Sequence, residues 1–123
     1  MIGPQQNSYW YLASPYSHPD EAIRHARYEQ VETALAWLLI RRMRSYSPIV
    51  HCHAMAVRHK MPTDAGFWQD YNHLMIGKAD GVIVLRIEGW EQSKGVTEER
   101  EFAAQIRKPV LDLLPTPDGY LLA

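Results

Sequence analysis

Cysteine is nearly absent from this chain of 123 residues, since Cys52 is the only one. No disulfide can form within the chain, which is typical of proteins in a reducing compartment. Long hydrophobic runs are missing too, because the longest, Ala34 to Ile40, has seven residues and a membrane helix needs about 20. The segment Met1 to Asn7 has neither the basic start nor the apolar stretch of a secretory signal. We therefore expect a cytoplasmic protein with no membrane partner.

An excess of charge of one sign is also missing. The chain has 13 lysine and arginine residues and 14 aspartate and glutamate residues, so its formal net charge is −1. A dedicated binder of nucleic-acid polymers normally carries a basic face, and this balance argues against one. A small anionic ligand needs only a few donors and is compatible with the composition.

Common cofactor and metal motifs are absent as well. The chain has no Gly-Lys-Ser/Thr P-loop, and no G-x-G-x-x-G follows a predicted strand, which disfavours a dinucleotide cofactor. His51, Cys52 and His53 are residue types that bind zinc, but their spacing matches no C-x-x-C or H-E-x-x-H pattern. We predict that the protein binds no metal and no cofactor. His51 directly follows a predicted strand, which makes it a candidate ligand contact instead.

What the chain does have is the composition of an ordinary globular domain, with 46% hydrophobic and 22% charged residues. A domain of this length buries roughly two thirds of its surface, which is enough for a core. No repeat, low-complexity tract or linker divides it. We therefore interpret residues 1–123 as one domain.

Hydrophobic patterning predicts alternating strands and helices. We expect strands at 9–13, 46–50, 80–85 and 108–113, and helices at 20–44, 67–78 and 95–107. Residues 51–66 lack periodicity and are predicted as a long loop, and the residues after 113 as a tail that contains proline and glycine. Such alternation is typical of a parallel sheet between two layers of helices. The predicted fold is α/β, a flavodoxin/Rossmann-like three-layer sandwich with a four- to five-stranded, mainly parallel sheet.

Sheets of this kind bind ligands at the carboxyl ends of their strands. In this chain those ends are the loops at 14–17, 51–66 and 86–94, and we expect any site to be assembled there. In the last of them, Ser93 and Gly95 open a predicted helix, whose first unpaired amides attract anions. A helix cap and a turn glycine would explain the same two residues without a ligand.

Glu99 is the most informative single residue. Phe102, Ala103 and Ile106 follow it at spacings of three, four and seven, which places Glu99 on the helix face that packs against the sheet. An inward carboxylate is costly unless it is paired or used. The nearby helix N-terminus favours its ionised form, which a nucleophile requires. The alternative is a surface carboxylate that leans inward and pairs with an arginine.

Three segments carry a family resemblance. They are Tyr11-Leu12-Ala13-Ser14-Pro15-Tyr16, Ala79-Asp80-Gly81-Val82-Ile83-Val84, and the pattern Gly89-Trp90-x-x-Ser93-x-Gly95-x-x-x-Glu99-x-x-x-Ala103. Together they resemble the nucleoside 2-deoxyribosyltransferase superfamily, which includes deoxynucleoside 5′-monophosphate N-glycosidases, and within it a branch of small bacterial proteins. The resemblance extends over about residues 9–113, and its last segment is the most specific.

The resemblance implies a catalytic mechanism. A glutamate at the position of Glu99 attacks the anomeric carbon, the base leaves, and water or a second base resolves the glycosyl-enzyme. A second acidic residue on the preceding helix helps to protonate the base or to orient the nucleophile. Family spacing favours the position of Asn72 for it, whereas chemistry favours Asp70, because an amide cannot donate an acid proton.

The resemblance also implies a set of substrate contacts. Ser93 and the helix amides near Gly95 correspond to a phosphate site, and the loop after the first strand to the sugar and phosphate side. Tyr16 in that loop would serve equally well as core packing. The tryptophans have the chemistry to stack on a base, or to cover the core. The predicted substrate-binding residues are Ser14, Pro15, Tyr16, His51, Trp68, Trp90, Ser93 and Gly95.

We therefore predict a nucleoside or nucleotide N-glycosidase or deoxyribosyltransferase that acts through a covalent glycosyl-Glu99 intermediate without a cofactor. The alternative is a non-catalytic nucleotide-binding or sensing module on the same fold, which Asn72 in place of an acid would fit. A third hypothesis is a flavodoxin-like or metal-dependent protein that uses the histidines of 51–59. The resemblance further implies a homo-oligomer, a dimer or tetramer.

Overall fold

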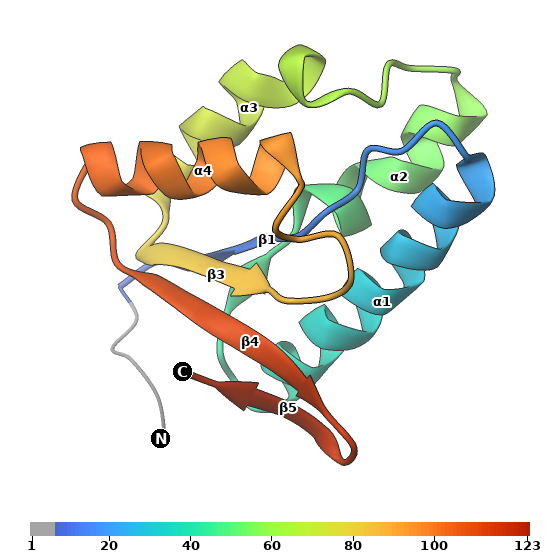
Figure 1. The fold of residues 1–123 in the computed structure, drawn as a ribbon. Coiled ribbons are helices and arrows are strands. Elements are labelled where there is room, and N and C mark those ends of the chain that lie inside the picture. The colour runs from blue at the N-terminus through green and yellow to red at the C-terminus, as the bar shows by residue number, and fades with distance from the viewer. Residues whose placement is uncertain (1–6) are drawn as a thin grey trace.

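A five-stranded sheet lies between two layers of helices in the computed structural model, which describes residues 7–123 (Figure 1). The strands are β1 (Trp10–Ala13), β2 (Ser45–Tyr46), β3 (Gly81–Leu85), β4 (Val110–Thr116) and β5 (Gly119–Leu122). The helices are α1 (Glu21–Ile40), α2 (Pro48–Arg58), α3 (Ala65–Lys78) and α4 (Lys94–Gln105). The strand order is β2-β1-β3-β4-β5, and only the β4–β5 pair is antiparallel. This is the flavodoxin-like order, so the predicted α/β class is confirmed.

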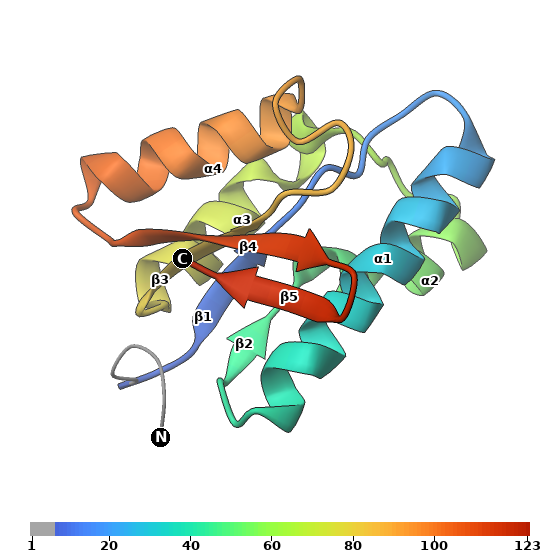
Figure 2. The same ribbon diagram turned by 60° about the horizontal axis from the view of Figure 1, so that its bottom comes forward.

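The two faces of the sheet have separate hydrophobic cores. On one face, Leu12 and Ile83 pack with Val31 and Leu38 of α1. On the other face, α3 and α4 pack against side chains that alternate with these along the strands, among them Tyr11, Val82 and Val84. Figures 1 and 2 show α3 and α4 on one side of the sheet and α1 on the opposite side. Every residue of β3 is buried, which is typical of a central parallel strand with an unbroken apolar run.

The start of β3 requires a glycine. A Cβ atom at Gly81 would lie 2.5 Å from Cζ3 of Trp10 and 2.6 Å from the carbonyl oxygen of Pro109. Trp10 and Gly81 are paired in register across β1 and β3. The indole of Trp10 therefore fills the space that any other side chain would occupy.

The predicted strand at 46–50 and loop at 51–66 were wrong. β2 has only two residues, and α2 begins directly after it, because Ser47 caps the helix by accepting a hydrogen bond from the Val50 amide and Pro48 fits the first turn. The buried face of α2 consists of Cys52, His53 and Ala56, at spacings of one, three and four. When His53 is counted as a polar residue, the sequence shows no apolar stripe at helical spacing, and the helix is not predicted.

The predicted end of the first helix and the predicted tail after residue 113 also need correction. The helix predicted over 20–44 ends at Ile40, and Arg42 adopts a φ of 62°, a left-handed conformation that stops the helix. The segment after residue 113, predicted as a tail, contains regular structure, because β4 continues to Thr116 and β5 returns antiparallel to it. Pro117, Asp118 and Gly119, whose φ is 147°, form the connection.

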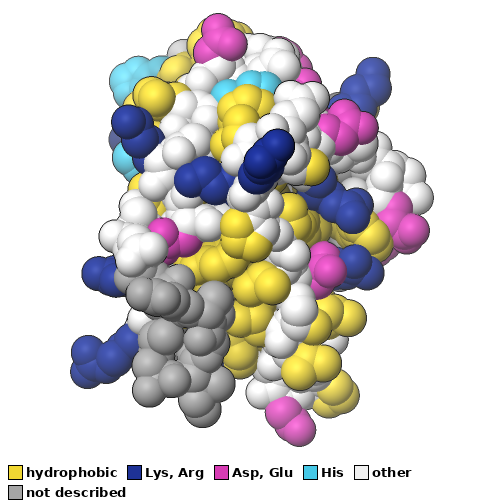
Figure 3. All heavy atoms as spheres, turned by 90° about the vertical axis from the view of Figure 1, so that its left-hand side faces the viewer, with side chains coloured by type: hydrophobic (Ala, Val, Ile, Leu, Met, Phe, Trp, Pro, Cys, Tyr) yellow, Lys and Arg dark blue, Asp and Glu magenta, His cyan; other side chains and the backbone are white. Residues whose placement is uncertain are grey.

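Basic and acidic side chains are interspersed on the face drawn in Figure 3, and hydrophobic side chains reach the surface between them. Within residues 7–123, no helix is long and apolar enough to cross a membrane.

Candidate active site

A cavity of about 330 Å³ opens at the carboxyl ends of β1 and β3. Its walls come from the loop after β1, the helix α2, the segment that leads into α3, and the loop that leads into α4. The connection after β1 leads to α1 on one face, whereas that after β3 leads to α4 on the other, so the cavity lies at the topological switch point. Its volume suits one small ligand.

Glu99 lies in the wall of this cavity and is only 7% exposed. The hydroxyl of Tyr11, a fully buried residue of β1, donates a hydrogen bond to Oε2 of Glu99. Burial raises the pKa of Glu99 to about 8, against the lowering effect of the Tyr11 hydrogen bond and with a smaller raising effect from Glu98. The inward position follows the sequence prediction. The predicted ionised form of Glu99 is not the main one at pH 7. Desolvation raises its pKa by more than the N-terminus of α4 can lower it, so the carboxyl is mostly neutral.

The N-terminus of α4 forms another part of the wall. Ser93 is its N-cap, and the Ser93 hydroxyl accepts a hydrogen bond of 3.2 Å from the Val96 amide, which leaves the hydroxyl proton free to donate. Lys94 and Gly95 also line the cavity. A Cβ atom at Gly95 would lie 3.7 Å from Cβ of Ala65, so the first turn of α3 lies beside the first turn of α4. Two helix N-termini therefore meet at the cavity, where an anionic group is favoured.

Two buried polar atoms in residues that line the cavity have no hydrogen-bond partner among the described residues. They are Oγ of Ser14, directly after β1, and Oδ1 of Asn72 on α3. A buried polar atom without a partner costs about 1–3 kcal/mol, so each is poised to bond a ligand or an ordered water. This places an acceptor and a donor–acceptor on two different walls of the cavity.

Tyr16 and His53 form a polar pair at the side of the cavity near α1. Oη of Tyr16 lies 2.7 Å from Nδ1 of His53, and the two rings meet edge to face. Nε2 of His53 lies 3.3 Å from Nδ1 of His25 on α1, and the ring of Tyr28 stacks on His53 at 4.4 Å. Burial lowers the pKa of His53, and His25 and Arg24 lower it further, with Glu21 opposing them. His53 is therefore held neutral.

A family model described as a domain of unknown function (DUF1937) matches residues 8–113. The chain belongs to this family. The matched segment contains every residue that lines the cavity. No curated protein matches the chain.

Seven of the predicted site residues of this DUF1937 domain come together at the cavity. Trp68 is held there by the hydrogen bond that its Nε1 donates to the carbonyl oxygen of Pro62, at 2.9 Å. The structure places Asn72, rather than Asp70, on the cavity side of α3. The seven are Ser14, Tyr16, Trp68, Asn72, Ser93, Gly95 and Glu99.

Four predicted residues lie outside the cavity lining. Asp70 is exposed on α3, and Pro15 is buried in the core. His51 is exposed on α2, because the helix turns it away from its neighbour His53. The Trp90 ring lies under the guanidinium of Arg86, at 4.2 Å, and packs on the core beneath α4.

Several lining residues were missed by sequence reasoning, chiefly His53, Cys52, Asp64 and Lys94. Recognition of α2 as a helix would have found the first two, since residues 52, 53 and 56 share its inner face. Asp64 is the N-cap of α3, and its Oδ1 accepts a hydrogen bond from the Phe67 amide at 2.9 Å. An Asp three residues before the first apolar position of the helix was the signal for it.

Metal-ligating side chains do not gather at this site. In the part of the chain that the structure describes, no three histidine, cysteine, aspartate or glutamate side chains are placed to hold one ion. Cys52 is a free, buried thiol whose pKa is raised by burial.

Proposed function

We propose that this protein cleaves the N-glycosidic bond of a nucleoside or nucleotide, as a hydrolase or a deoxyribosyltransferase, with Glu99 as the nucleophile. The observation that carries the proposal is the buried Glu99 carboxyl in the wall of a cavity at the β1/β3 switch point, held by the Tyr11 hydroxyl. A carboxylate kept in place by a buried partner is pre-oriented for attack on a carbon in the cavity. The resemblance to nucleoside 2-deoxyribosyltransferases supports the same role for this residue.

The chemistry proceeds in two steps, as in retaining glycosidases. The ionised Glu99 carboxylate attacks the anomeric carbon while the bond to the base nitrogen breaks, which gives a glycosyl-enzyme. Water or a second base then attacks the same carbon and releases Glu99. The Tyr11 hydrogen bond stabilises the carboxylate before attack and after release.

The other cavity groups fit the parts of such a substrate. The unpaired atoms of Ser14 and Asn72 are suited to sugar hydroxyls or to the polar edge of the base. The Trp68 indole offers an aromatic surface for the base. Lys94 and the N-terminus of α4, with the Ser93 hydroxyl, are suited to a 5′-phosphate.

The test is a panel of ribo- and deoxyribonucleosides and their 5′-monophosphates, with release of free base followed by chromatography. We expect release from at least one compound and its loss, by at least about 1000-fold, in the Glu99→Gln variant. Glu101→Gln is the matched control, because Glu101 is an exposed carboxylate on the same helix. The absence of release across the whole panel would contradict the proposal.

A second function, a nucleotide-binding or sensing module, is favoured by one observation. Asn72 lines the cavity where an acid is expected from the resemblance, and Asp70 is exposed outside it. Calorimetry separates the two functions. Tight binding of a nucleotide by the wild-type protein without any product supports the module, whereas turnover supports the enzyme.

A further inference from the structure

No acidic side chain occupies the position at which the family resemblance places the second catalytic acid. Asn72 presents an amide to the cavity and cannot supply an acid proton, and Asp70 is exposed and outside the cavity lining. A proton must still reach the departing base, because an unprotonated purine or pyrimidine anion is a poor leaving group. The cavity wall offers another route for this proton.

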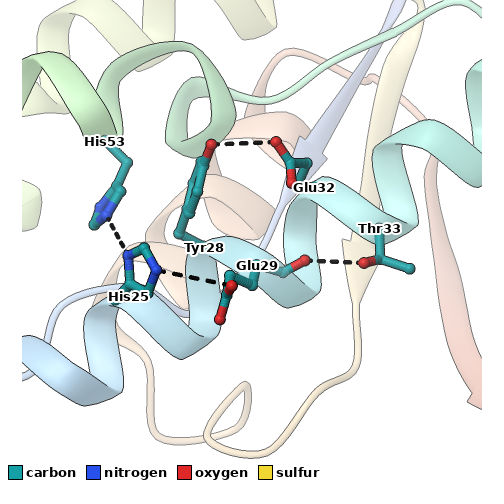
Figure 4. A network of polar contacts seen from close by, with 6 residues as sticks. All are labelled: His25, Tyr28, Glu29, Glu32, Thr33 and His53. Atoms are coloured by element: carbon teal, nitrogen blue, oxygen red, sulfur yellow. Dashed lines mark hydrogen bonds and ion pairs between the residues drawn. The ribbon is translucent and has the colours of Figure 1, made fainter.

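One chain of hydrogen-bonding groups leads from the cavity to the surface. Oη of Tyr16 and Nδ1 of His53 are 2.7 Å apart, and Nε2 of His53 and Nδ1 of His25 are 3.3 Å apart. Nε2 of His25 lies 3.8 Å from Oε2 of Glu29. His53 is 5% exposed, whereas the side chain of His25 is 57% exposed. Figure 4 shows the rings of His25 and His53 turned toward each other, with Glu29 beyond His25.

This series of hydrogen-bonding side chains also connects two cavities. His53 lines the cavity that contains Glu99, and with His25 and Tyr28 it lines a second, surface cavity between α1 and α2. Each ring nitrogen of His53 faces one neighbour, so its two nitrogens contact groups on opposite sides. A neutral imidazole in this position accepts a proton at one nitrogen while it releases one from the other.

We propose that Tyr16, His53 and His25 form a proton relay that delivers a proton to the leaving base and takes one back from the attacking water. The proposal rests on the proposed function of Glu99 and names the general acid that the same site requires. Tyr16 is the catalytic residue of the relay, because it lines the cavity, and His53 and His25 act through it.

The steps balance in both half-reactions. As the bond from the anomeric carbon to the base breaks, its electron pair leaves with the base and the Glu99 carboxylate forms the new bond. The Tyr16 hydroxyl gives its proton to the base and takes one from Nδ1 of His53, while Nε2 of His53 takes one from Nδ1 of His25. The exposed His25 ring takes a replacement proton from solvent at Nε2. When water attacks, each proton moves back by one position, so the net product is free base and sugar.

The groups that surround Tyr16, His53 and His25 are compatible with this proton transfer. The Tyr28 ring stacks on His53 at an interplanar angle of 18° and holds its plane, and the Tyr28 hydroxyl is turned away to Glu32 (Figure 4). Burial raises the pKa of Tyr16, and the Arg24 guanidinium opposes this by lowering it. The titratable and charged groups around His53 and its partner His25 are Tyr16, Glu21, Arg24, Tyr28, Glu29, Cys52 and Arg58.

The activity test compares two leaving groups. Tyr16→Phe and His25→Asn are expected to slow release of an ordinary base by about 100-fold and about 10-fold, within the usual range of acid catalysis. For a 4-nitrophenyl deoxyriboside, both variants are expected to keep kcat/KM within about twofold of the wild-type value. Nitrophenolate leaves without a proton, and kcat/KM covers only the steps up to its release, before water attacks. A misplaced cavity wall would instead slow both substrates alike. His25 is exposed, so its variant leaves the core intact. Controls are His59→Asn, at the exposed end of α2, and Tyr120→Phe, on β5.

A second measurement does not depend on activity. The ¹⁵N shifts of the His53 ring report which nitrogen carries the proton, and we expect Tyr16→Phe and His25→Asn each to change them, whereas His59→Asn does not. Unchanged His53 shifts in both variants would overturn the relay.

The outcomes also separate the two proposals. Loss of base release in Glu99→Gln with full activity in the relay variants refutes the relay and keeps the proposed function. A leaving-group-dependent loss in Asp64→Asn, but not in Tyr16→Phe, assigns the acid to Asp64 and also refutes the relay. No cleavage of either substrate by the wild-type protein refutes the proposed function, and the catalytic role of the relay with it, even if the ¹⁵N shifts show the three groups coupled.

Discussion

Glu99 carries a conflict between stability and chemistry. Its carboxyl is buried in the cavity wall, where the neutral form is favoured, yet attack on a carbon requires the ionised form. The Tyr11 hydroxyl reduces the cost of ionisation but does not cancel it. A buried carboxyl with a strongly raised pKa indicates a functional role rather than a contribution to stability.

This conflict predicts a pH-dependent stability. The pKa of Glu99 rises from 4.5 in the unfolded chain to about 8 in the folded protein, so the unfolded chain ionises first and the free energy of unfolding falls as the pH rises from 4.5 to 8. The loss is on the order of 5 kcal/mol at 1.36 kcal/mol per pKa unit. Glu99→Gln is therefore expected to be more stable than the wild-type protein at pH 8 and similar to it at pH 5, by thermal unfolding at both pH values. Equal melting temperatures at pH 8 would contradict the burial of an ionisable group here, and Glu101→Gln is the control.

The same pKa predicts the pH profile of catalysis. For a 4-nitrophenyl deoxyriboside, which needs no proton to leave, kcat/KM is expected to rise about tenfold per pH unit and to level off near pH 8, because only Glu99 must ionise. Initial rates of nitrophenolate release between pH 5.5 and 9.5 measure it. A profile that is already level at pH 6 would show that Glu99 is ionised there and that its burial does not control the reaction.

At the scale of single elements, helix caps with similar geometry divide into structural and ligand-facing ones. Ser93 caps α4 and lines the cavity, whereas Ser47 caps α2 and is buried outside the cavity lining. We expect Ser93→Ala and Ser47→Ala each to lower the free energy of unfolding by about 1 kcal/mol. Only Ser93→Ala is expected to weaken binding of a nucleoside 5′-monophosphate relative to its nucleoside. Chemical denaturation and calorimetry measure the two effects, and equal ligand affinities in the two variants would remove Ser93 from the phosphate site.

Two glycines in neighbouring elements are expected to respond in opposite directions to the same change. At Gly81 an added methyl group would collide with the Trp10 ring and the Pro109 carbonyl, so Gly81→Ala is expected to cost about 1–3 kcal/mol. At Gly77 on α3 a Cβ atom meets nothing within 4 Å, so Gly77→Ala is expected to stabilise the protein by up to about 1 kcal/mol. Chemical denaturation of both variants checks the pair, and a stable Gly81→Ala would show that Trp10 can move.

At the scale of the whole molecule, the expected homo-oligomer stays a prediction with a direct test. Phe67 and Leu74 lie two turns apart on α3 and are 52% and 59% exposed, and large exposed apolar residues on one helix face are a common mark of association. Light scattering of the full chain is expected to give two or four times the chain mass of 14.2 kDa. A single species of 14.2 kDa at micromolar concentration would contradict it.

Sequence patterns predicted the sheet and its class because β1 and β3 are continuous apolar runs and α1 and α4 have clear helical spacing. They failed at α2, where a buried histidine and a cysteine interrupt the apolar stripe, and at β5, where a short edge strand follows a Pro-Asp-Gly connection. Tertiary packing decides both cases, since α2 is fixed by its contacts with α1 and the hydrophobic core, and β5 by its pairing with β4.

The candidate site was predictable where one residue's helical position determines its direction. The spacing around Glu99 was enough to turn it inward, and strand ends were enough to place Ser14 and Tyr16 near it. The pairing of His53 with His25 was not predictable, because it joins residues 28 positions apart through the packing of two helices. The pKa of Glu99 was out of reach for the same reason, since it depends on desolvation by the whole cavity wall.

The antiparallel strand β5 completes the edge of the sheet and lies apart in sequence from the residues that line the cavity. All residues of the cavity wall lie between Ser14 and Glu99, the segment that matches the DUF1937 family ends at residue 113, and β5 follows beyond it. The proposed chemistry therefore depends on side chains within the first hundred residues, while the β4–β5 hairpin forms the edge of the sheet and contributes none of the cavity lining. For an engineer, the turn at Pro117 and Asp118 is accordingly a natural place to insert a label or a tether, away from the reacting groups.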